Sequence, residues 1–139
     1  MNHKSFYPTA TLGAAALIGS VVVAIPAQAG GGDFTERAGR CSAAAHWVMK
    51  AKPDTGRIEL EFSVETQRAG QRWRVRITDN GKQIFLGRRI TNRVSHSFSV
   101  DRMVGNRSGT DRFRARAENG AGQVCFGHVP LAPNSSNSG

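Results

Sequence analysis

Apolar and polar residues alternate along three long stretches of the chain, 58–65, 72–78 and 112–118. In each stretch every second residue is apolar or alanine, and the residues between are mostly charged. A period of two places successive side chains on opposite faces, which is the pattern of a strand with one buried and one solvated face. Weaker runs of the same kind occupy 43–51, 83–91, 95–100 and 122–128. The pattern therefore predicts about seven strands and no helix, in an all-β fold.

Turn-forming residues separate some of these stretches and not others. Asn80-Gly81 can adopt the positive φ angles that a two-residue hairpin requires, and 53–56 and 119–122 are two further hairpin signals. The connections 66–71, 92–95 and 101–110 lack tight-turn chemistry. Hairpins that alternate with crossings between two sheets predict an antiparallel β-sandwich.

Two segments near the end of the domain carry a resemblance to a known fold family. In 97–104 followed by 111–122, an aromatic-bearing strand leads into an Ala-x-Asn-x-x-Gly-like hairpin. These segments resemble the last third of a fibronectin type III domain, which implies an immunoglobulin/fibronectin type III-like sandwich. The long proline-rich first strand of that family is missing from this chain.

Three other stretches, 56–62, 70–77 and 106–112, carry a second resemblance. They are similar to a group of small secreted actinobacterial proteins of unassigned function, and the similarity runs from about Cys41 to Val129. This resemblance implies export and implies no particular activity.

The amino terminus has the pattern of a cleavable signal peptide, residues 1–29. Lys4 precedes an uncharged apolar stretch, and the small residues Ala27 and Ala29 stand where signal peptidase cleaves. The alternative is a membrane anchor, but the apolar core is shorter than the ~20 residues that a span requires. No cysteine lies at the cleavage point to carry a lipid. The sequence therefore predicts a secreted (extracellular) protein without a membrane span after cleavage.

After cleavage the chain has the length of one domain, predicted at 41–131, with flexible tails at 30–40 and 132–139. Cys41 and Cys125 lie near the two ends of that domain. In an oxidising compartment this even count predicts a structural disulfide. A catalytic or metal-binding thiol is the alternative, and neither cysteine has the CxxC partner that would favour it.

Residues suited to catalysis are scattered along the chain. His46, His96 and His128 do not lie at metal-ligand spacing, and the chain has no HExxH motif and no G-x-S-x-G elbow. We therefore expect no catalytic residues, no metal and no cofactor, and a protein that is not an enzyme. A His–carboxylate pair that forms only on folding stays open as the alternative.

Charge is the most informative feature of the sequence. The full chain carries a formal net charge of +9, of which the predicted leader contributes only Lys4. Six arginines occupy the solvated positions of the strands 72–78 and 112–118. If these strands are neighbours in one sheet, all six guanidinium groups lie on one outer face, with Glu59, Glu61 and Glu65 on the opposite sheet. The six are Arg72, Arg74, Arg76, Arg112, Arg114 and Arg116.

Two arrangements of these charges remain open. If 58–65 pairs with 72–78 across Gly70, the glutamates and arginines form cross-strand ion pairs and the face is merely solvated. If the arginine strands are neighbours, the face presents planar forks that match phosphate and carboxylate oxygens.

The second arrangement predicts a non-catalytic binding module of unknown ligand. Anionic cell-envelope polymers and extracellular nucleic acid are the candidate partners. The alternative is a protein-binding module or secreted inhibitor acting through its loops, above all the connection 102–111.

Overall fold

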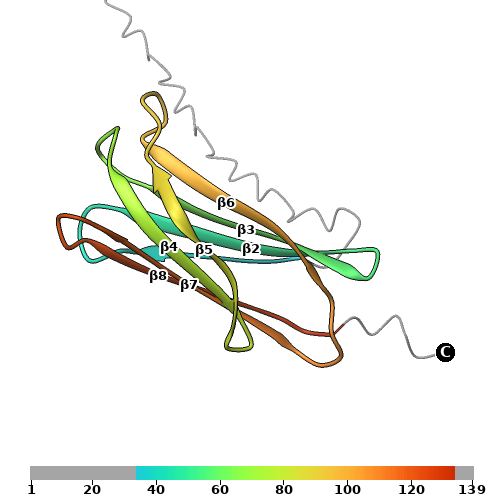
Figure 1. Cartoon of the computed structure of the whole chain (residues 1–139). Helices are drawn as coiled ribbons and strands as arrows, with labels where there is room; N and C mark the ends of the chain where they lie inside the picture. The colour runs from blue at the N-terminus through green and yellow to red at the C-terminus, as the bar shows by residue number, and fades with distance from the viewer. Residues whose placement is uncertain (1–33, 134–139) are drawn as a thin grey trace, which may run out of the picture.

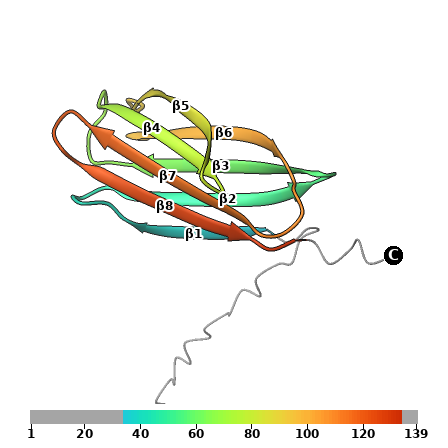
Figure 2. The same cartoon turned by 60° about the horizontal axis from the view of Figure 1, so that its bottom comes forward.

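The computed structural model describes residues 34–133, which form eight strands in two antiparallel sheets packed face to face (Figures 1 and 2). This confirms the all-β sandwich. No helix that could cross a membrane occurs within residues 34–133. The predicted signal peptide, 1–29, lies outside the described residues. The strands are β1 (Thr35–Arg40), β2 (His46–Asp54), β3 (Arg57–Glu65), β4 (Arg72–Asp79), β5 (Lys82–Ile90), β6 (Ser97–Gly105), β7 (Asp111–Asn119) and β8 (Val124–Leu131).

The strand order answers the question that the charge pattern left open. One sheet has the order β1-β2-β3-β6 and the other the order β5-β4-β7-β8. β4 therefore pairs with β7, while β3 lies in the opposite sheet (Figure 2). The alternative in which β3 and β4 form a hairpin with facing glutamates and arginines is wrong.

The alternating apolar residues of both sheets meet between them and form the core. Trp73 is 1% exposed, and its ring centroid lies 5.9 Å from that of Phe98 across the sandwich. Trp47, at 5% exposure, lies closer to the edge, where its ring contacts that of His128. Both tryptophans thus belong to the core, as their place in the alternation predicts. The largest other side chains that are fully buried are Phe62, Phe113, Met49, Ile58, Leu60 and Ile77.

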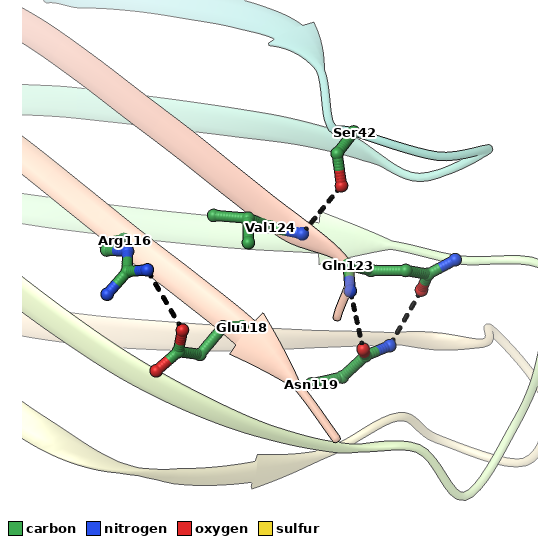
Figure 3. A network of polar contacts seen from close by, with 6 residues as sticks. All are labelled: Ser42, Arg116, Glu118, Asn119, Gln123 and Val124. Atoms are coloured by element: carbon green, nitrogen blue, oxygen red, sulfur yellow. Dashed lines mark hydrogen bonds and ion pairs between the residues drawn. The ribbon is translucent and has the colours of Figure 1, made fainter. Parts of the chain in front are cut away.

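The three hairpin signals connect consecutive strands of one sheet. Asn80 (φ 48°) and Gly81 (φ 85°) both have positive φ, as a two-residue hairpin between β4 and β5 requires. In the β7–β8 hairpin, Asn119 Oδ1 accepts hydrogen bonds from the backbone N–H of Ala121 and of Gln123. Its Nδ2 donates to Gln123 Oε1 at 2.7 Å (Figure 3).

The disulfide between Cys41 and Cys125 is present, with an S–S distance of 2.04 Å. It joins the segment after β1 to β8 and so links the two sheets. The neighbouring Ser42 reinforces this link, because its N–H donates to the Val124 carbonyl at 2.9 Å. Its Oγ accepts a hydrogen bond from the Val124 N–H, also at 2.9 Å (Figure 3).

β1 corrects one prediction. Residues 30–40 were expected to be a flexible tail, but Thr35–Arg40 pair along their whole length with β2. This strand has no apolar alternation and its own side chains are mostly exposed, so it contributes backbone hydrogen bonds at a sheet edge and few buried side chains. Periodicity alone could not detect it.

β6 corrects a second prediction. The connection between β6 and β7 was expected to begin near Asp101, but β6 continues to Gly105 in register with β3. Half of the proposed protein-binding loop 102–111 is therefore strand, and only 106–110 remain as the connection between β6 and β7.

The sandwich edge between β5 and β6 is closed by cations stacked on an aromatic ring. Phe85 has the guanidinium of Arg89 at 4.8 Å from its ring centroid and that of Arg102 at 4.7 Å. Arg89 also donates a hydrogen bond to the Ser99 carbonyl at 3.2 Å. These contacts join the two sheets at the edge opposite the disulfide.

Candidate functional site

The two arginine strands lie side by side in one sheet, which is the second of the two arrangements that the sequence left open. β4 pairs with β7 so that Arg76 is directly opposite Arg116 and Arg74 is opposite Glu118. All six predicted arginines are exposed, since their apolar neighbours fill the core. On such a sheet their Cα atoms are about 4.8 Å apart between strands and about 7 Å apart along a strand.

This outer face forms an open groove of about 800 Å³. Five of the six predicted arginines line it, whereas Arg72 lies beyond its end, opposite Ile90. The five are Arg74, Arg76, Arg112, Arg114 and Arg116.

The groove also contains residues that the sequence did not assign to this face. Arg37 reaches it from β1 of the other sheet, and His128 and Phe126 enter from β8. Leu86 of β5 lies opposite Arg76, while Phe126 lies opposite Arg116. One row of exposed side chains, running across the sheet from β5 to β8, therefore consists of Leu86, Arg76, Arg116 and Phe126. For Phe126, the only sequence feature that indicated a place on a strand was the weak alternation of 122–128. For Arg37, no sequence feature indicated a place in the groove, because β1 was not predicted.

Almost no negative charge balances the arginines. Among residues 34–133, Glu118 is the only carboxylate that lines the groove, and its Oε2 lies 3.1 Å from Arg116 Nη2 (Figure 3). This is the only ion pair among residues 34–133. The Arg116 guanidinium also lies 5.8 Å from the centroid of the Phe126 ring. Arg116 is thus oriented by two neighbours, and the other arginines face solvent without a carboxylate partner.

The outer face of the opposite sheet is mixed in charge and not simply acidic. Glu59 lies opposite Lys52, and Glu61 lies opposite Lys50, because β2 and β3 are neighbours. The glutamates therefore do not neutralise the arginine groove, and they do not create a strongly acidic second face either.

Two buried carboxyl groups lie on neighbouring strands, at the end of β4 and the start of β7. Asp79 is 8% exposed and Asp111 is 1% exposed, and each has one carboxyl oxygen without a hydrogen-bond partner. Burial raises the pKa of both carboxyls, and the charge of Asp79 raises that of Asp111 further. The Arg107 guanidinium opposes this rise in pKa at both groups.

The three histidines of residues 34–133 lie on different elements. His46 is at the start of β2, His96 is in the turn before β6, and His128 is in β8. No group of three histidine, cysteine or acidic residues suited to a metal ion occurs within residues 34–133. The concentrated chemistry of the described domain is therefore the arginine groove.

No protein-family model, curated protein or solved structure matches this chain. The resemblances to fibronectin type III domains and to small secreted actinobacterial proteins stay predictions. A functional conclusion has to come from the groove itself.

Proposed function

We propose that this protein is a secreted, non-catalytic binding module that holds anionic polymers in the arginine groove. The observation that carries the proposal is the placement of Arg76 directly opposite Arg116 on an exposed sheet face. Like charges placed opposite each other destabilise a sheet. An anion bound between them would remove that cost, and arginine forks match the oxygens of phosphate, sulfate and carboxylate groups.

Secretion is part of this proposal. The pattern of residues 1–29 is that of a signal peptide, and a disulfide is compatible with an oxidising, extracellular location. Polyanions of the cell envelope and extracellular nucleic acid are the candidate ligands in that location.

The proposal is tested by measuring affinity for polyphosphate and for single-stranded DNA over a range of salt concentrations. Binding through arginines releases counterions, so the logarithm of the affinity falls linearly with the logarithm of salt concentration. Replacing Arg74, Arg76, Arg114 and Arg116 by glutamine should abolish binding at moderate salt. With single-stranded DNA each phosphate contact contributes ~0.7 to the slope of log affinity against log salt. Loss of the four arginine contacts should therefore reduce the magnitude of this slope by about three.

A matched variant separates the groove from total charge. Arg40, Lys52, Arg57 and Arg93 lie outside the groove, and their replacement by glutamine removes the same charge. This control should keep most of the affinity and most of the slope. Equal loss in both variants, or no binding by the wild-type domain, would reject the groove as a polyanion site.

A further inference from the structure

An exposed aromatic ring lies within the arginine groove. Phe126 is 63% exposed on the outward side of β8, whose buried positions are Cys125, Gly127, Val129 and Leu131. Arg116 of β7 lies directly opposite Phe126, and its guanidinium lies over the Phe126 ring. A solvated ring beside a row of cations costs hydrophobic free energy in the unbound protein. It gains a role if the ligand carries flat apolar surfaces as well as negative charge.

The hydrogen-bonding groups of the groove narrow the ligand further. Arginine donates and cannot accept hydrogen bonds. The acceptors within the groove side chains are few: Thr78, His128 and Glu118, and Glu118 already binds Arg116. A hydroxyl-rich polysaccharide needs acceptors for its many O–H groups. A DNA backbone presents phosphate oxygens, which only accept, so its chemistry complements this groove better.

We propose that the ligand of the groove is single-stranded DNA, with one base stacked on Phe126 and the neighbouring phosphates on Arg76, Arg114 and Arg116. This inference rests on the proposed polyanion function and specifies its ligand. Single-stranded DNA combines phosphates with unpaired bases whose faces are free to stack on an aromatic side chain. In a duplex the bases are stacked on one another, and polymers such as polyphosphate or a teichoic acid have no flat rings to place on Phe126.

The test compares two fluorescently labelled oligomers of equal length and charge, oligo(dT) and an oligomer of abasic sites. Binding is measured by fluorescence anisotropy at one fixed salt concentration. The wild-type domain should bind oligo(dT) more tightly, by about five- to 150-fold, the effect of one base–aromatic stack. Phe126→Ala should reduce the affinity for oligo(dT) to that for the abasic oligomer, and Phe126→Trp should keep the preference.

Phe34 supplies the matched control. It is also exposed, at 46%, and carries a cation over its ring, that of Lys50, but it does not line the groove. Phe34→Ala should leave the preference for oligo(dT) unchanged. Thermal unfolding of each variant confirms that the fold is retained, which is expected because both rings are solvated.

The outcomes separate this inference from the proposed function. Equal wild-type affinity for the two oligomers, or tighter binding of duplex DNA or of an anionic polysaccharide, would overturn the single-stranded DNA proposal and leave polyanion binding intact. A preference that survives Phe126→Ala would overturn the stacking position. Absence of binding to every polyanion would overturn both proposals.

Discussion

Arg76 and Arg116 occupy directly opposite positions on neighbouring strands, and both side chains are solvated. Glu118 pairs with Arg116, but no carboxylate within residues 34–133 pairs with Arg76. The fold therefore carries a local repulsion at the centre of its candidate binding face, where a bound anion would relieve it.

Replacing Arg76 by glutamate should separate stability from binding. An opposite-charge pair with Arg116 would replace the like-charge pair, so the free energy of unfolding should rise by about 0.2–1 kcal/mol at low salt. Urea denaturation at low and at 1 M salt measures this gain, which screening should remove at high salt. Polyanion affinity should fall in the same variant.

Arg93→Glu is the control for this prediction, because Arg93 is exposed in the connection between β5 and β6. It makes the same change of charge away from the groove. A stability gain equal to that of Arg76→Glu would attribute the effect to net charge and not to the pair.

The Asp79 and Asp111 carboxyls should make the domain less stable as the pH rises. Because the pKa of each carboxyl is raised by folding, the folded state binds protons more tightly than the unfolded chain. The free energy of unfolding then falls as the pH increases from about 3.9, the ordinary value for Asp, through the raised pKa values. Chemical denaturation between pH 3 and pH 8 measures this window.

Asp111→Asn should flatten the pH dependence of stability and raise stability at neutral pH, because the amide carries no charge to be desolvated or to repel Asp79. The exposed Asp101 of β6 offers the control substitution Asp101→Asn. An unchanged pH profile in Asp111→Asn would mean that other groups cause the dependence.

Loss of the disulfide should destabilise the domain strongly. Cys41 and Cys125 are separated by 84 positions, and closing a loop of that length contributes about 4–5 kcal/mol in the chain-entropy model. The Cys41→Ser, Cys125→Ser double variant should therefore show a large decrease in denaturation midpoint. Ser42→Ala removes only the neighbouring hydrogen bond and should cost about 1 kcal/mol. Equal midpoints for the double variant and the wild type would contradict this prediction.

Gly127 should tolerate no side chain. A Cβ atom there would lie 2.7 Å from Cε2 of Phe62 and 3.2 Å from Cε3 of Trp47, both core residues. Gly127→Ala should therefore lower the free energy of unfolding by about 1–3 kcal/mol through overpacking. Gly105 is the matched position, since nothing lies within 4 Å of a Cβ there and its φ is not positive. Similar losses in Gly105→Ala and Gly127→Ala would point to backbone effects instead.

The sequence predicted the sheets and the arginine face because both depend on a period of two. Trp73, Phe62 and Phe113 are buried because they alternate with charged residues, and the same alternation exposes the arginines of β4 and β7. The disulfide followed from the cysteine count and the expected compartment. These features are local patterns or follow directly from them.

The rest depended on information that a local pattern does not contain. A β-bulge near Ile84 shifts the register of β5 against β4, so that Arg88 rather than Gly87 lies opposite Arg74. With this shift Arg89 lies opposite the buried Trp73 and is half-buried, whereas Arg88 is exposed. Regular alternation from the Asn80-Gly81 turn would place Arg88 on the core side instead. Arg37 enters the groove from another sheet, which depends on tertiary packing alone.

The close packing of β1 on Trp47 bears on how the domain is shortened for expression. A Cβ atom on Gly39 would lie 2.7 Å from Trp47 Nε1, so the indole rests directly on the main chain of this strand. A recombinant version that starts at Cys41 would keep every residue with a recognisable sequence signature, yet leave one side of that indole in water. Such a version would be a poor reference for binding measurements, since Arg37 would be lost together with the cover.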